Sequence, residues 1–106
     1  MAARLAASIK VRTQLREGTC TLRALLRHPM DVGRGKDESG HTRKAHFITE
    51  VRCEHRGEPV LVAHWGGGIA KDPYLSVVFT GAAPGDRLTV SWEDNWGETD
   101  TLEVTL

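Results

Sequence analysis

The sequence of 106 residues lacks the features that mark a membrane protein, a disulfide scaffold or a nucleic-acid binder. No run approaches the roughly 18 apolar residues that a membrane helix needs. Two cysteines, Cys20 and Cys53, with no Cys-x-x-Cys motif, are too few for a disulfide-dense domain. Fourteen basic and fourteen acidic residues cancel, whereas a dedicated nucleic-acid binder normally carries a strong basic excess. We therefore expect one soluble domain whose partners are neither membranes nor nucleic acids.

The neutral total conceals two halves of opposite charge. Residues 1–53 hold eleven basic and five acidic residues, and residues 54–106 hold an equal excess of acidic ones. Such halves suit a protein that sits in a charged assembly, or one that pairs its own charges within a single sandwich. Solvated strand faces are the simpler interpretation, and the sequence leaves these alternatives open.

Helical periodicity is missing as well, and apolar residues instead alternate with polar ones, which is the period of a half-buried strand. Seven such runs occur, at residues 9–16, 20–27, 47–53, 60–65, 74–80, 88–93 and 102–106. The pattern predicts an all-β fold, a seven-stranded antiparallel immunoglobulin-like β-sandwich. Residues 9–106 would form this single domain after a flexible N-terminal segment at residues 1–8. We expect Trp65 and Trp92 in its core.

The sequence offers no recognisable catalytic or cofactor motif. Five histidines, at positions 28, 41, 46, 55 and 64, raise the question of a metal site, because imidazole is the commonest metal ligand. Their spacing fits neither a blue-copper site nor the Cys-x-x-His-Gly element of a superoxide reductase. No serine stands in a Gly-x-Ser-x-Gly elbow. We therefore predict no catalytic residue, no metal and no cofactor, and keep a superoxide-reductase-like metal-binding β-sandwich enzyme as an alternative.

Cys20 and Cys53 fall on the strand faces that the alternation assigns to the core. We expect two small buried side chains with weak thiol reactivity. The sequence does not decide whether they pair with each other. A disulfide between them would close a loop of about 34 residues and stabilise the fold by roughly 3–4 kcal/mol.

The segment at residues 29–45 has no periodicity of either kind and holds three glycines among charges, which predicts one long exposed loop. Loops of this length are uncommon and often functional. Four basic residues lie on it: Arg34, Lys36, Arg43 and Lys44. We expect them to steer anionic partners through long-range attraction, with a simple solvated loop as the alternative.

Several short elements occur in an order that is known from one protein family. They are His28-Pro29-Met30, Ala45-His46-Phe47-Ile48 leading into Glu50-Val51, Asp72-Pro73-Tyr74-Leu75-Ser76 with Phe79, Gly85-Asp86, Val90-Ser91-Trp92-Glu93-Asp94-Asn95 and Gly97-Glu98-Thr99-Asp100. Through these elements, from Ile9 to the C-terminus, the chain resembles the SoxZ family, the small subunit of the SoxYZ sulfur carrier of thiosulfate oxidation.

The resemblance implies a non-catalytic subunit that pairs with SoxY in a heterodimer, and the sequence does not decide whether two heterodimers pair further into a heterotetramer. SoxY carries the sulfur substrate on a C-terminal Gly-Gly-Cys-Gly-Gly arm, which this chain lacks, and the Sox enzymes contact the complex transiently. The family is exported folded with its signal-bearing partner. The resemblance therefore implies a periplasmic location by co-export.

On this hypothesis the chain buries an apolar face against SoxY, and such interfaces are rich in aromatic residues and methionine. The candidates are large apolar groups near strand ends or on the face opposite the predicted core: Met30, Phe47, Ile48, Tyr74 and Trp96. A free-standing ligand-binding immunoglobulin-like module is a further alternative. It predicts a monomer without a large exposed apolar patch.

Overall fold

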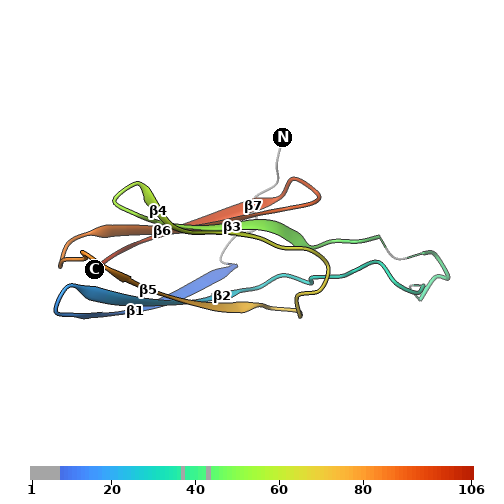
Figure 1. Ribbon diagram of the computed structural model, residues 1–106. Coiled ribbons are helices and arrows are strands. Elements are labelled where there is room, and N and C mark those ends of the chain that lie inside the picture. Colours follow the sequence, from blue (N-terminus) through green and yellow to red (C-terminus); the bar gives the residue numbers. More distant parts are fainter. Residues whose placement is uncertain (1–7, 37, 43) are drawn as a thin grey trace.

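The computed structural model describes residues 8–36, 38–42 and 44–106, which form two β-sheets packed face to face (Figure 1). The strands are β1 (Ile9–Arg16), β2 (Thr19–Leu26), β3 (Ile48–His55), β4 (Glu58–His64), β5 (Tyr74–Thr80), β6 (Arg87–Asp94) and β7 (Thr99–Thr105). The flexible segment expected at residues 1–8 lies, except for Ser8, outside the described residues. Among those that are described, no helix is long and apolar enough to cross a membrane.

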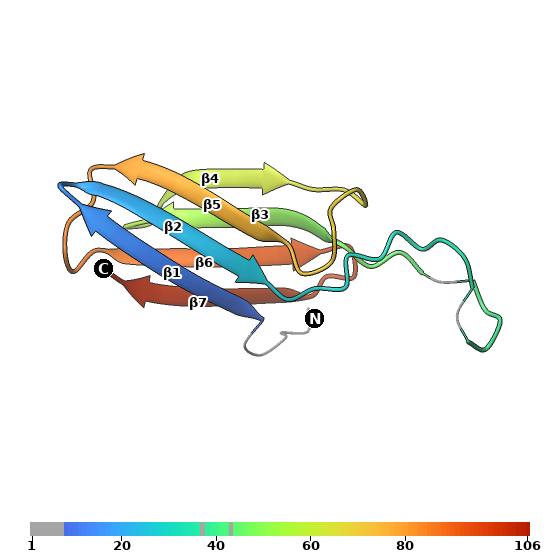
Figure 2. The same cartoon turned by 90° about the horizontal axis from the view of Figure 1, so that it is seen from below.

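The two sheets divide the strands three to four. One sheet has the order β1-β2-β5, and the other has the order β4-β3-β6-β7. All neighbouring strands are antiparallel. Figure 2 looks onto the outer face of the three-stranded sheet, with the strands of the second sheet behind it. The predicted seven-stranded antiparallel sandwich is thus confirmed.

Two of the hairpins are closed by a two-residue turn whose second residue is glycine. Glu17 and Gly18 join β1 to β2, and Arg56 and Gly57 join β3 to β4. All four residues have positive φ, between 48° and 83°. Two consecutive positive φ angles define the type I′ turn, whose twist matches that of the strands it connects. These turns set the register of both hairpins.

The core lies between the sheets and is built by the inward residues of the alternation. Leu22, Leu26, Val51 and Leu88 are fully buried within it. Trp92 is buried as predicted, and its indole N–H donates to the Ser8 hydroxyl at 3.0 Å; Trp65 is only partly buried at the margin. Cys20 and Cys53 are fully buried free thiols, which confirms the core assignment and leaves them unpaired with each other.

The entry into β3 does not follow simple alternation, which would place Phe47 toward the core and Ile48 away from it. A β-bulge between Ile48 and Glu50 shifts the pairing with β6, so that Ile48 is fully buried and Phe47 only partly. Met30 is buried beside it, and its Sδ accepts a hydrogen bond from the Ile48 N–H at 3.3 Å. The alternation is therefore wrong for Ile48, which it placed away from the core, and Met30, a candidate near a strand end, also belongs to the core.

The segment between β2 and β3 extends far beyond the sandwich, as predicted for a long exposed loop (Figures 1 and 2). Its two arms pair at the base, where the backbones of Asp31 and His46 exchange two hydrogen bonds of 2.7 Å, and again near the tip, where Lys36 pairs with Thr42. The loop base packs on the glycine run after β4, since a Cβ on Gly67 would lie 2.8 Å from Val32. The glycine run therefore permits close approach of the loop.

Candidate functional site

Four ionisable side chains meet at the end of the sandwich from which the long loop leaves. His28 follows β2, His46 precedes β3, Asp94 ends β6, and Glu98 lies in the turn between β6 and β7. Their ligand-type atoms all lie within 4.8 Å of one another. We call His28, His46, Asp94 and Glu98 the histidine–carboxylate cluster. It ties the loop base to the four-stranded sheet.

One carboxylate oxygen of Asp94 binds both imidazoles. Its Oδ2 lies 3.0 Å from Nε2 of His28 and 2.8 Å from Nε2 of His46. Nε2 of His46 also lies 2.9 Å from Oε2 of Glu98. The Asp94 and His28 side chains are fully buried, whereas those of His46 and Glu98 retain partial exposure. The cluster therefore has a closed inner half and an outer half in contact with solvent.

The second oxygen of Asp94 organises the β6–β7 turn. Its Oδ1 accepts the backbone N–H groups of Trp96 at 3.0 Å and Glu98 at 2.8 Å. Burial alone would raise the pKa of Asp94, but its hydrogen bonds with His28, Glu98 and His46 outweigh burial and hold this pKa below its usual value. Asp94 is therefore an ionised carboxylate at neutral pH, with both oxygens engaged.

The backbone around His28 determines which of its nitrogens carries a proton. Nδ1 of His28 accepts the N–H of Met30 at 3.1 Å, so the proton of the neutral ring must sit on Nε2 and be donated to Asp94. The His28 backbone is held in turn by Asp72, whose Oδ1 accepts the His28 N–H at 3.0 Å. His28 acts here as a hydrogen-bond bridge between the core and the β6 terminus.

Trp96 covers the outer half of the cluster. Its ring stacks on that of His46 with centroids 3.6 Å apart and planes within 5° of parallel. Its indole N–H donates to the Ala45 carbonyl at 2.8 Å, while 54% of the residue stays exposed. The indole therefore has one face on the loop base and the other toward solvent.

Two histidines and two carboxylates are a donor set that divalent metals accept, but the hydrogen bonds of His28 oppose this use. Metal-binding imidazoles coordinate through one nitrogen and normally donate a hydrogen bond from the other. In His28 the other nitrogen, Nδ1, already accepts an N–H and cannot donate. The arrangement fits a structural hydrogen-bond cluster better than a metal centre.

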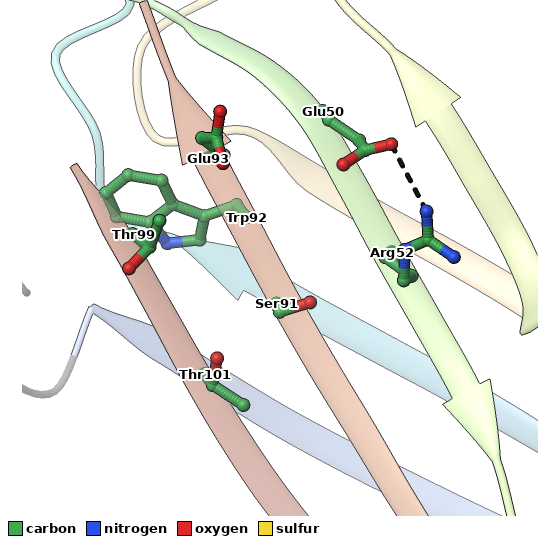
Figure 3. A pocket seen from close by; sticks show the side chains of 7 residues that line it. All are labelled: Glu50, Arg52, Ser91, Trp92, Glu93, Thr99 and Thr101. Carbon is green, nitrogen blue, oxygen red and sulfur yellow. Dashed lines mark hydrogen bonds and ion pairs between the residues drawn. The ribbon is translucent and has the colours of Figure 1, made fainter. Parts of the chain in front are cut away.

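A hollow on the outer face of the four-stranded sheet is a second place to look for catalytic residues (Figure 3). Its lining comes from β3, β6 and β7: Glu50, Arg52, Ser91, Trp92, Glu93, Thr99 and Thr101. The Arg52 guanidinium is paired with Glu50 at 3.4 Å, as the dashed line in Figure 3 marks. Ser91 has no histidine beside it in this lining to act as a base. The hollow therefore presents no nucleophile–base pair.

The candidate interface residues separate into two groups. Tyr74 and Trp96 are exposed, at 61% and 54%, whereas Met30 and Ile48 belong to the core and Phe47 packs partly against it. Of the basic loop residues, Arg34, Lys36 and Lys44 are exposed, and Arg43 lies outside the described residues. Tyr74 and Trp96 lie on different parts of the molecule, at the start of β5 and in the β6–β7 turn.

Sequence reasoning did not find the histidine–carboxylate cluster. His28 and His46 flank the long loop, and the carboxylates follow some fifty residues later, so no local spacing links the four side chains. The pairing of β3 with β6 brings them together. A hint was present in the sequence, because His28, His46 and Asp94 all stand at the ends of predicted strands.

A comparison with protein families matches residues 9–105 to a model described as sulphur oxidation protein SoxZ. The match begins at the first residue of β1 and ends at the last residue of β7. It therefore spans the whole sandwich and the long loop. A comparison with curated proteins gives no match.

Proposed function

This chain belongs to the SoxZ family and takes part in sulphur oxidation by the Sox system, and within that system we propose that it is a non-catalytic subunit that binds SoxY. The partner would carry the sulfur substrate on its cysteine arm, and this chain would hold the partner folded. The observation that carries the proposal is the family match over nearly the whole chain. The periplasm, reached by co-export with SoxY, is the proposed location.

The state of the two thiols supports a role without covalent sulfur chemistry on this chain. Sulfur carriers need an accessible thiolate, because the thiolate is the nucleophile. Cys20 and Cys53 are fully buried. Burial raises the pKa of both thiols, that of Cys53 to about 11. Neither sulfur is therefore available to accept a substrate at neutral pH.

Exposed apolar side chains support a binding role. Val32, Val62, Tyr74, Val78 and Trp96 are the large hydrophobic residues that the described surface exposes. Aromatic residues are enriched in protein–protein interfaces, where they act as buried anchors. Tyr74 and Trp96 are the two predicted interface residues that the fold leaves open to such a partner.

Co-expression with SoxY tests this function. The expected result is a 1:1 complex on size-exclusion chromatography that persists at micromolar concentration. Elemental analysis of the same sample should give no stoichiometric iron or copper, which the metal-enzyme alternative requires. A chain that stays monomeric beside folded SoxY would overturn the proposal.

We propose in addition that the basic loop accelerates encounters with anionic partners of the complex. Arg34, Lys36 and Lys44 are exposed on a segment that extends away from the sandwich, and none forms an ion pair with another described residue. Replacing all four loop cations by glutamine should slow turnover of the reconstituted system at low salt, with little effect at high salt. Unchanged turnover at low salt would remove the steering role.

A further inference from the structure

The two sheets of the sandwich carry opposite charge. Strands β1, β2 and β5 hold four basic residues and no acidic one: Lys10, Arg12, Arg16 and Arg23. Strands β3, β4, β6 and β7 hold seven acidic residues and two basic ones. One sheet is therefore basic and the other is predominantly acidic.

These charges do not neutralise each other within the molecule. The two basic residues of the acidic sheet pair with acids of that same sheet, Arg52 with Glu50 and Arg87 with Glu103. None of the four cations of the basic sheet forms an ion pair with any described residue. Of the three interpretations left open by the sequence, self-complementation within one sandwich is not seen among the described residues, which leaves solvated strand faces and a charged assembly.

The four cations share the outer face of their sheet, which Figure 2 views directly. Their neighbours Ile9, Val11 and Leu15 on β1 and Leu22 and Ala24 on β2 turn the other way, toward the core. Arg12 lies directly opposite Arg23 across the β1–β2 pair. Like charges directly opposite each other on neighbouring strands destabilise a sheet. The fold itself gains nothing from this pair, which points to a role outside the chain.

An apolar strip borders the cations on the same face. Lys10, Leu25 and Tyr74 form one row across the three strands, and Leu25 and Tyr74 line a surface hollow together with Lys10, Arg12 and Arg23. Val78 lies further along β5 and is 64% exposed. We call Lys10, Arg12, Arg16, Arg23, Leu25, Tyr74 and Val78 the basic sheet face.

Strand β5 also presents an unprotected edge. It pairs only with β2, and none of the described residues forms a hydrogen bond to its other side. Its sequence, Tyr-Leu-Ser-Val-Val-Phe-Thr, contains no charge, proline or glycine. Natural proteins usually shield such edges with charges, proline or a covering segment. On the opposite side of the sandwich β1 and β7 lie closer to each other than β4 and β5 do on this side.

Resting on the proposed function, we propose that SoxY docks on the basic sheet face and covers the edge of β5. The contacting surface of the partner would be apolar at the centre, against Leu25, Tyr74 and Val78, and acidic around it. Charge complementarity argues for a partner of this kind. A second copy of this chain fits the basic sheet face less well. If the acidic sheet of one copy stacked on the basic sheet of another, each pair would still leave one basic and one acidic face free. Further copies would then add at both ends, and the assembly would not close into a dimer.

Two matched valine variants test the location. Val78→Asp places a carboxylate in the apolar strip, and we expect it to weaken the Kd for SoxY at least about tenfold. Val62→Asp is the control, because Val62 is exposed on β4, another edge strand, but lies opposite Arg52 on the outer face of the other sheet. It should bind like the wild type. Equal affinity of the two variants would overturn the docking site.

Arg23→Glu separates binding from folding. The new carboxylate would lie opposite Arg12 and turn a repulsive cross-strand pair into an attractive one, so the melting temperature should stay level or rise. Affinity for SoxY should nevertheless fall about tenfold, and its dependence on salt should become shallower. Undiminished affinity in this variant would contradict the proposal even if Val78→Asp failed to fold.

Binding of SoxY by the wild-type chain distinguishes an error in the docking site from an error in the proposed function. If the wild-type chain forms no complex with SoxY, the proposed function is wrong. If the wild type binds and both basic-sheet-face variants bind equally well, only the docking site is wrong. Self-association of the wild-type chain at low salt that Val78→Asp abolishes would assign the face to a second copy and likewise overturn the inference.

Discussion

At the scale of single residues, Asp94 has the most connections at the loop end of the sandwich. Its Oδ2 meets two imidazoles and its Oδ1 accepts two backbone N–H groups, all with the side chain fully buried. A buried carboxylate stays ionised only where hydrogen bonds compensate for lost hydration. This explains why its pKa is lowered despite burial. The loop, the core and the β6–β7 turn all depend on this one group.

Replacing Asp94 by asparagine should therefore destabilise the fold by about 3 kcal/mol at pH 7, because the amide has one acceptor oxygen and its NH2 must face either the two imidazoles or the backbone N–H groups of Trp96 and Glu98. Since the pKa of Asp94 is lower in the folded chain than in the unfolded chain, its stabilising effect is complete above about pH 4 and lost as pH falls through the folded value. The gap between wild type and Asp94→Asn should shrink at acid pH in urea unfolding. Glu98→Gln, at a partly exposed group, is the control and should cost under about 1 kcal/mol. A gap that is constant from pH 2.5 to pH 7 would refute the ionised state.

The two thiols make a second prediction at this scale. Since burial raises the pKa of Cys53 to about 11 and also raises that of Cys20, both stay protonated and enclosed at neutral pH. Iodoacetamide at pH 7.5 should therefore label neither cysteine in the native chain and both after unfolding in urea. Intact mass reads the number of adducts. Fast labelling of the native chain would contradict the buried, unreactive state.

At the scale of elements, several contacts fix the base of the long loop to the sandwich. The paired backbones of Asp31 and His46 hold the two arms together, and the Trp96 indole covers His46. The Asn95 side chain adds two further bonds, donating to the Ala45 carbonyl at 2.9 Å and accepting the Phe47 N–H at 2.8 Å. The β6–β7 turn thus clamps the loop where it enters β3.

Trp96→Ala should loosen this clamp without unfolding the sandwich. We expect faster amide hydrogen exchange at Asp31 and His46, by a factor of about 5–30 if the lost stacking and hydrogen bond contribute about 1–2 kcal/mol. The core amides of Val51 and Val90 should exchange as in the wild type. Trp96→Phe keeps an aromatic ring for stacking but loses the bond to Ala45, so its effect should be smaller. Unchanged exchange at the loop base would show that Trp96 does not hold it.

The elements were predictable from the sequence where the determinants are local. Alternation of apolar and polar residues has the period of a strand, and Glu17-Gly18 and Arg56-Gly57 suit two-residue turns, so all seven strands could be placed. The bulge near Thr49 depends on pairing with β6; it buries Ile48, which the alternation placed outward, and leaves Phe47 only partly buried. The histidine–carboxylate cluster was missed for the same reason, since it joins residues that only the sheet order brings together.

At the scale of the whole molecule, the two sheets of the sandwich differ in charge. The sequence showed a basic first half and an acidic second half, but β3 leaves the first half for the acidic sheet, so the halves do not coincide with the sheets. Sheet order could not be derived from alternation, which says which residues face inward and not which strands are neighbours. The resulting basic face and the extended loop are two separate surfaces on which a partner-binding subunit can act.

In its proposed role this chain binds a thiol-bearing partner and carries no substrate sulfur itself. Intact mass of both subunits of the co-purified complex after turnover with thiosulfate tests it most directly. We predict that sulfur and sulfonate mass additions occur on SoxY alone, while this chain keeps the mass of its unmodified sequence. Additions of the same kind on Cys20 or Cys53 would contradict it.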